Sequence, residues 1–197
     1  MDRASAQLAA LPLEARLPLL QLCLPTLRRM SPQQYLNFKG NIQKIIETDG
    51  MIDLVEFAWQ KLLLRNLDPH FTKEVARVIQ YYAWQPLLGD AAILLSALAY
   101  AGQDTDQEAA KAFDIGWAQI RSPLPYALLS RQDASVDQID TALDRLAKGS
   151  PFIKKKMIDA CAYTAASDEK ICPTEAELLR AIADVLDCPL PAFIEGI

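Results

Sequence analysis

The stretch Asp49-Gly50-Met51-Ile52-Asp53-Leu54-Val55-Glu56 reappears 119 residues later as Asp168-Glu169-Lys170-Ile171-Cys172-Pro173-Thr174-Glu175. Over twenty aligned positions five residues are identical, where chance would give one or two in so Ala- and Leu-rich a chain: Asp49, Ile52, Glu56, Leu67 and Asp68 recur as Asp168, Ile171, Glu175, Leu186 and Asp187. Each stretch follows one apolar helical pattern and precedes another. We therefore expect a duplicated helix–turn–helix unit, over residues 32–68 and 152–187.

Helix starts and ends can be read directly around the first copy. Ser31-Pro32-Gln33-Gln34 places Ser at the N-cap, Pro at the first helical position and Gln at N3, a typical helix start. Gly50 suits the left-handed turn after a helix, and Asp53 with Glu56 predicts a capping box on the next one. Similar signals recur along the chain, which is 51% apolar with Ala and Leu far more frequent than Val. They predict an all-α fold of about eight or nine helices.

The same signals predict how the chain is organised. We expect a single all-helical domain over residues 1–197, in which the two copies of the repeat flank a central helical segment. Ser122-Pro123-Leu124-Pro125 interrupts the helical pattern and is the best candidate for an internal joint, between sub-halves 1–121 and 126–197. Prolines at 18 and 25 should kink or split the helix over 13–30. Residues 72–88 are also expected to be helical.

Charge and composition exclude several classes of protein. A formal net charge of −5 and a pI near 4.9 argue against nucleic-acid binding, which needs clustered Lys and Arg. No apolar run approaches the ~20 residues that span a bilayer, so we expect no direct membrane insertion. The one basic run, Lys154-Lys155-Lys156, should be the solvated start of a helix, with contact to phosphate or lipid as the alternative. Four well-separated cysteines without C-x-x-C spacing indicate a reducing, cytoplasmic setting.

The chain offers little for catalysis. Its single histidine, His70, has no patterned Cys or carboxylate partners, which favours a loop position over a metal or catalytic role. The H-E-x-x-H, G-x-S-x-G and P-loop patterns do not occur. Five aromatic residues could line a ligand pocket or form a contact patch, although helical spacing favours the core: Trp59, Trp84, Trp117, Tyr81 and Tyr82. We therefore expect a non-catalytic chain with no cofactor of its own.

The carboxylates of the matched turns are the candidate metal ligands: Asp49, Asp53, Glu56, Asp168 and Glu175. Hard divalent cations prefer several oxygen ligands from a tight loop, but the EF-hand pattern D-x-[DN]-x-[DN]-G is absent. The alternative is that these side chains cap helix starts, which contributes roughly 0.5–2 kcal/mol each, and capping is the favoured interpretation. In the second copy Glu169 replaces Gly, so a left-handed turn there should be costlier. Cys172 is likewise a poor N-cap residue.

Two family resemblances enter at these turns. Asp-Gly, a short gap and a Thr-Pro-x-Glu-like start before an Ala/Leu-rich helix resemble the TerB-like fold of tellurite-resistance proteins and of a membrane-anchored DnaJ-type co-chaperone. Several separated strings are similar, in order, to the C-terminal region of bacterial membrane-bound M48 (Ste24-like) zinc metalloproteases: Leu17-Pro18-Leu19-Leu20, Leu24-Pro25-Thr26-Leu27-Arg28, residues 36–46 with Asp49-Gly50, and residues 175–184 with Cys188-Pro189-Leu190-Pro191. In those proteases a transmembrane portion carrying H-E-x-x-H precedes a soluble helical region of about this size.

The M48 resemblance implies a non-catalytic regulatory or interaction domain, cytoplasmic and tethered to the inner membrane by the preceding protease portion. Met1 would then not be the natural start, and zinc would belong to the protease portion. Expected partners are proteins: that portion, another protomer in a homo-oligomer, or a separate protein. The TerB resemblance implies an alternative, a free-standing cytoplasmic module for divalent-ion binding or stress response. Its acidic residues map onto Asp49, Asp53, Glu56, Asp168 and Glu175.

Overall fold

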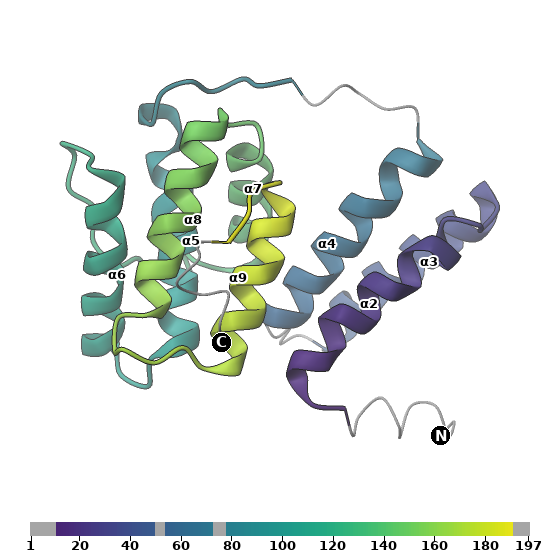
Figure 1. Cartoon of the computed structure of the whole chain (residues 1–197), viewed down its shortest axis with the longest axis horizontal. Helices are drawn as coiled ribbons and strands as arrows, with labels where there is room; N and C mark the ends of the chain where they lie inside the picture. Colours follow the sequence, from purple (N-terminus) through teal and green to yellow (C-terminus); the bar gives the residue numbers. More distant parts are fainter. Residues whose placement is uncertain (1–10, 50–53, 73–77, 191–197) are drawn as a thin grey trace. The chain divides into compact units, whose positions relative to one another are not determined.

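A computed structural model describes residues 11–49, 54–72 and 78–190 of the chain. Figure 1 shows helices joined by turns and extended segments. The described part contains eight α-helices, one short 3₁₀ helix and no β-strand, which confirms the all-α prediction. The elements are α2 (Leu13–Leu27), α3 (Pro32–Asp49), α4 (Leu54–Phe71), the 3₁₀ helix η1 (Gln85–Leu87), α5 (Leu88–Gly102), α6 (Asp106–Ile120), α7 (Val136–Leu146), α8 (Pro151–Ala165) and α9 (Pro173–Val185).

The chain divides into two compact units. Unit 1 consists of Met1–Met51 and Leu63–Glu74, and unit 2 of Ile52–Leu62 and Val75–Ile197. Helix α4 therefore contributes its first half to unit 2 and its second half to unit 1. The division does not fall at 122–125, because α5 and α6 before that segment pack within unit 2 against α7 and α8 after it.

The core of unit 1 is formed by α2, α3 and the second half of α4. Leu24, Leu63 and Leu67 are buried there together with Tyr35. The Tyr35 ring stacks on Phe71 with centroids 4.3 Å apart, and its hydroxyl donates a hydrogen bond to Asp68 Oδ1 at 2.6 Å. Lys39 Nζ contacts the same oxygen at 2.7 Å. One carboxylate of α4 thus holds two side chains of α3.

Helix α5 is the central element of unit 2. Ten of its residues are buried, and α6, α7, α8 and α9 all pack against it. Such a position follows from its sequence, because a helix that is apolar on every side must be covered on every side. Helices α6 and α8 approach each other at Gly116, where an added Cβ would collide with the Thr164 hydroxyl and the Ala160 carbonyl. Glycine at this position therefore sets the distance between the two helices.

Two helices of unit 2 begin at side-chain caps. Ser150 accepts a hydrogen bond from the Ile153 N–H at 3.4 Å, and Pro151 follows as the first residue of α8. Thr105 caps α6 in the same way through the Glu108 N–H at 3.2 Å. Both caps act within four residues of the helix start, whereas Ser135 before α7 makes no side-chain cap hydrogen bond.

Prolines interrupt the helices less than expected. Helix α2 is a single helix that contains Pro18 and Pro25, so the expected split does not occur. Helix α4 continues for two residues beyond Pro69. A proline inside a helix removes a backbone hydrogen bond and costs about 3 kcal/mol. Burial of Leu17 and Leu24 on α2 offsets part of this cost, because each buried Leu contributes roughly 1.5–3 kcal/mol.

The helix expected over residues 72–88 is wrong for the described residues from 78 to 84. These residues are extended or bent, and Tyr81 forms an isolated parallel bridge with Gly149. Their β-branched and aromatic side chains favour extended backbone. The backbone that pairs with them belongs to the turn before α8, far along the chain, and a local pattern cannot reveal such a partner.

Each copy of the repeat contains a contact between its two helices, and the two contacts are made by matched positions. In the first hairpin Tyr35 of α3 binds Asp68 of α4, and in the second Lys154 of α8 lies 4.0 Å from Asp187, two residues beyond the end of α9. Tyr35 and Lys154 are matched positions of the repeat, as are Asp68 and Asp187. In both hairpins, therefore, the start of the first helix meets the end of the second, as a duplicated helix–turn–helix unit requires.

Candidate functional site

The turn between α8 and α9 contains the second set of candidate ligands. Glu169 has a φ of 66°, in the left-handed region that normally favours glycine. Asp168 Oδ1 accepts a hydrogen bond from the Lys170 N–H at 3.1 Å, so this carboxylate stabilises the turn. The left-handed turn predicted from the alignment with Gly50 is present, and it is held by an Asp–backbone contact.

Glu175 forms the cap of α9. Its Oε2 accepts a hydrogen bond from the Cys172 N–H at 2.9 Å, and the weakly accepting Cys172 sulfur completes the capping box. The side chain is only 3% exposed and lies against Gly102 of α5, where any Cβ would collide with its carboxylate. Burial raises the pKa of Glu175, the Cys172 N–H opposes that shift, and the charge of Asp168 adds to it. The carboxylate is therefore committed to a buried structural contact.

The turn between α3 and α4 differs from the turn between α8 and α9 in the burial of its matched glutamate. Asp49 ends α3, but its side chain lies outside the described part of the structure, as does all of Asp53. Glu56 is in the first turn of α4 and is exposed, whereas the matched Glu175 is buried. The two turns thus place the same residue type in different environments, so the repeat does not create two equivalent sites.

The remaining polar candidates are dispersed. His70 is exposed, near the end of α4 rather than in a loop, and its ring meets Phe71 edge-on at 5.1 Å. Within the described residues, no three His, Cys, Asp or Glu side chains are grouped so as to hold a metal ion. The four cysteines are free thiols: Cys23 is exposed, Cys161 buried, and Cys172 and Cys188 half-buried.

Sequence reasoning missed a buried carboxylate on α9. Glu177 is fully buried and its Oε1 accepts a hydrogen bond from Arg180 Nη1 at 2.7 Å. Its other oxygen, Oε2, has no hydrogen-bond partner among the described residues. The only signal in the sequence is the pair Glu177 and Arg180, three residues apart in a run from Ala176 to Ala183 whose other residues are apolar, and that signal resembles the exposed face of a helix.

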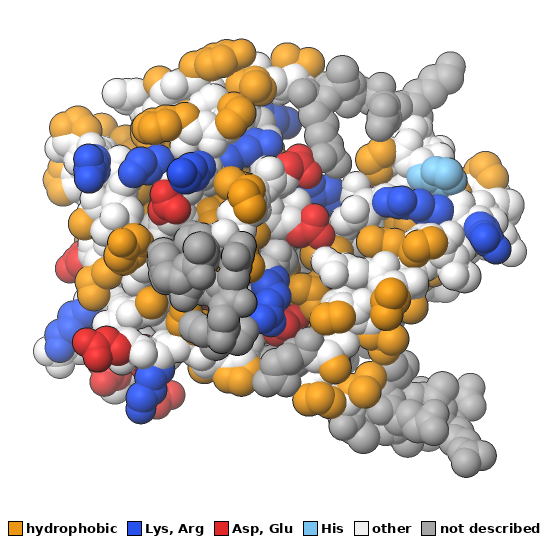
Figure 2. All heavy atoms as spheres, in the orientation of Figure 1, with side chains coloured by type: hydrophobic (Ala, Val, Ile, Leu, Met, Phe, Trp, Pro, Cys, Tyr) orange, Lys and Arg blue, Asp and Glu red, His pale blue; other side chains and the backbone are white. Residues whose placement is uncertain are grey.

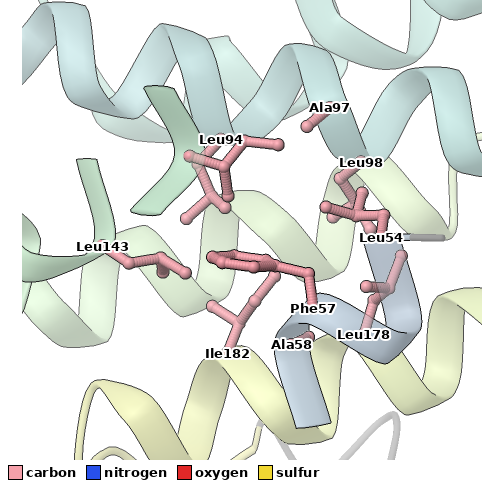
Figure 3. A pocket seen from close by; sticks show the side chains of 10 residues that line it. Leu54, Phe57, Ala58, Leu94, Ala97, Leu98, Leu143, Leu178 and Ile182 are labelled. Carbon is pink, nitrogen blue, oxygen red and sulfur yellow. The ribbon is translucent and has the colours of Figure 1, made fainter. Parts of the chain in front are cut away.

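The five aromatic residues, for which a core position was the favoured prediction, do not gather in a single pocket. Trp117 stacks on Phe113 in the core with ring centroids 5.7 Å apart, while Tyr82 is exposed and Trp84 lines a surface cleft. A separate internal pocket holds only about 10 Å³, and Figure 3 shows the Phe57 ring directed into it. Its lining is entirely apolar and it is about the size of one water molecule. It is a small packing defect rather than a ligand site.

The outer face of α2 carries exposed apolar side chains. Leu20 and Leu24 point into the unit 1 core, but Leu22 is 77% exposed and Leu19 is also exposed on the same helix. Cys23 is exposed beside them. Helix α2 is thus apolar on its covered face and on its uncovered face, which is characteristic of a surface that contacts another molecule.

No family model, curated protein or solved structure matches this chain. Among the described residues, no helix is both long enough and apolar enough to cross a bilayer. The fold and the local geometry define the class: an all-helical protein of two compact units, in which Asp168 and Glu175 make turn and helix-cap contacts.

Proposed function

We propose that this chain is a non-catalytic interaction domain, the cytoplasmic C-terminal region of a bacterial membrane-bound M48-type zinc metalloprotease. In this proposal the protease portion supplies zinc and proteolysis, and the helical region regulates it by binding that portion, another protomer or a protein partner. The observation that carries the proposal is the exposed apolar face of α2. The strings similar to M48-type proteases supply the parent.

The exposure of α2 favours docking over chemistry. A solvent-facing Leu gains nothing for the isolated chain, whereas its burial against a partner contributes roughly 1.5–3 kcal/mol. Leu19 and Leu22 are three residues apart and therefore lie on one side of the helix, where a partner can cover both. In the M48-type proteases that the sequence resembles, the protease portion precedes this region, so α2 would be the described helix nearest to it in sequence.

The environment of Glu175, in the turn between α8 and α9, also favours helix packing over ion binding. Glu175, one of the candidate ion ligands, is buried against Gly102 and accepts a hydrogen bond from the Cys172 N–H. Moving it to coordinate a metal would remove the cap of α9 and empty a packed position. Helix-face packing therefore remains the mode of action that the geometry of the described residues favours.

Co-expression with an M48-type protease portion tests the proposal. We expect the chain to co-purify with the protease portion or to change its proteolytic rate. The Leu22→Gln variant should weaken either effect, because it removes an apolar contact from α2 without touching the core. The matched control is Ile115→Gln, which changes an exposed apolar residue of α6 in unit 2. If a folded chain neither co-purifies with the protease portion nor changes its rate, the proposal is rejected. Equal loss of the effect in the Leu22→Gln and Ile115→Gln variants would also reject it.

A further inference from the structure

Three segments that are distant in sequence meet at one end of unit 2: residues 78–88, 120–126 and 145–156, together named the basic end face. The Gln80 N–H donates a hydrogen bond to the Lys148 carbonyl at 2.9 Å, which joins the first segment to the third. Arg145 Nη2 donates to the Pro86 carbonyl at 2.6 Å and joins the same two segments again. The first and second segments together line a cleft of about 270 Å³.

The charge of the basic end face is opposite to that of the whole chain. Its segments contain six Lys or Arg residues and no Asp or Glu, in a chain with a formal net charge of −5. In the described part of the chain, carboxylates from outside these segments pair with two of the six: Asp90 with Arg145 at 2.9 Å, and Asp187 with Lys154 at 4.0 Å. The other four cations are exposed or half-buried: Arg121, Lys148, Lys155 and Lys156.

Large apolar side chains lie among these cations. Tyr82 is 76% exposed, Phe152 is 65% exposed, and Leu124 and Val78 are more than half exposed. Tyr82 comes directly after the bridge between Tyr81 and Gly149, and Phe152 is the second residue of α8, just beyond Gly149, so both rings border the same junction. Figure 2 shows hydrophobic side chains gathered along the upper edge of this unit, next to a row of Lys and Arg.

We propose that the basic end face docks on the surface of a bilayer that contains anionic lipids. Lys and Arg are attracted to the negative headgroups, and exposed aromatic and aliphatic side chains enter the interface between headgroups and acyl chains. Tyrosine and lysine suit this depth, because each has an apolar stem and a polar end that stays hydrated. A soluble polyanion would use the cations and leave Phe152, Leu124 and Val78 in water.

This docking is peripheral and needs only the chain itself. The lysine run at the start of α8, expected from sequence to be solvated, becomes the electrostatic part of the contact. The apolar part comes from residues 78–82 and 124, which the fold brings beside that run. Membrane docking can therefore hold or fail independently of the proposed protease parent.

Vesicle sedimentation tests the proposal on the full chain. We expect binding to vesicles of phosphatidylcholine with phosphatidylglycerol, little binding to phosphatidylcholine alone, and a decrease as salt is raised. The double variant Lys155→Glu and Lys156→Glu should lower the partition coefficient about tenfold or more. Phe152→Ser should lower it by about tenfold, through loss of the inserted ring.

A matched charge control uses exposed lysines outside the face. The double variant Lys111→Glu and Lys170→Glu makes the same change in net charge on α6 and in the α8–α9 turn. It should keep the partition coefficient within about twofold of the parent. Circular dichroism confirms that each variant is folded, and Lys148→Glu provides a second folded charge variant.

The competing occupant is a soluble polyanion, represented by a heparin fragment. Failure of the chain to bind anionic vesicles, or equal binding to both vesicle types, overturns the proposal. Equal loss in the control and face variants also overturns it, because net charge alone would then explain the binding. So does tight heparin binding combined with vesicle binding that Phe152→Ser leaves unchanged.

Discussion

At the scale of single residues, Glu169 has the backbone conformation that glycine adopts most easily. Its φ of 66° costs a residue with a Cβ about 1–2 kcal/mol, and glycine returns part of this through its larger unfolded-state entropy. We expect Glu169→Gly to raise the free energy of unfolding by about 0.5–1 kcal/mol in urea titration. Glu169→Ala is the control, because it removes the charge and keeps the strain. Equal stability of the Gly and Ala variants would contradict this explanation.

Glu175 gives a pH-dependent prediction that also separates capping from metal binding. Burial raises its pKa, so the folded state holds the proton more tightly than the unfolded state. Its contribution to stability is therefore present below the ordinary carboxyl pKa of about 4.3 and is lost as pH rises through the folded value. Glu175→Gln keeps an acceptor for the Cys172 N–H and cannot ionise. Its stability relative to the parent should increase from pH 4 to pH 7.

Thermal melts at several pH values, with and without calcium, magnesium or zinc, make this measurement. Capping predicts the pH-dependent gain and no shift of Tm with metal in either protein. A metal-dependent increase in the parent that is absent from Glu175→Gln, and from Asp49→Ala combined with Asp168→Ala, would favour the ion-binding alternative. Saturation at a hundredfold excess over Kd would contribute about 2.7 kcal/mol, which is easily measured.

At the scale of elements, the contact between α3 and α4 depends on Asp68. The Tyr35 hydroxyl donates to its Oδ1, while the Tyr35 ring separately stacks on Phe71. We expect Tyr35→Phe to lower the free energy of unfolding by about 1–2 kcal/mol, since it removes a charge-assisted hydrogen bond and keeps the stacking. A double-mutant cycle with Asp68→Ala isolates the pair from the Lys39 contact. Additive effects of the two substitutions would show that the hydrogen bond is not stabilising.

At the scale of the whole molecule, the two units have cores of different extent. The unit 1 core has four buried side chains in one cluster, whereas α5 alone buries ten residues in unit 2. Local opening costs less where fewer apolar groups are buried. We expect backbone amides of α2 and α3 to exchange with solvent deuterium at a lower opening free energy than those of α5. Equal protection of the two sets would mean that the units open only together.

The reactivity of two cysteine thiols, one buried in unit 2 and one exposed in unit 1, tests the burial of these side chains. Cys161 is completely buried, and burial raises the pKa of its thiol to about 12. Cys23 is exposed on α2. Because the thiolate is the reacting species, a maleimide at pH 7.5 should label Cys23 rapidly and Cys161 only after unfolding. Mass spectrometry of the labelled peptides measures both rates, and comparable rates would contradict the burial of Cys161.

The same raised pKa predicts an effect of alkaline pH. The folded state keeps the Cys161 proton above pH 9, where an unfolded thiol loses it, so this group's contribution is full below pH 9 and decreases as pH rises towards 12. Tyr35, whose pKa is also raised by burial and by Asp68, acts in the same direction in unit 1. Unfolding free energies at pH 8 and pH 10 should therefore decrease less in Cys161→Ala than in the parent.

The features that sequence reasoning predicted correctly depend on interactions between residues close together in the chain. Ser31 with Pro32 predicted the start of α3, and the alignment of Glu169 with Gly50 predicted a left-handed turn that is present. The extended path of residues 78–84 was missed, because its hydrogen bonds are made with the turn before α8. The continuity of α2 through two prolines was missed for a related reason, since packing in the tertiary structure offsets the lost backbone bonds.

The sequence by itself determined the helices, because caps, turns and apolar periodicity act within a few residues. It also determined the repeat, whose matched Asp residues make matched contacts in both hairpins. Only the tertiary structure decided which of two matched glutamates is buried: Glu175 is buried and Glu56 is exposed. It alone brought six cations and several exposed apolar side chains to one end of unit 2. Burial and surface charge depend on residues far apart in the chain, and only the folded backbone brings them together.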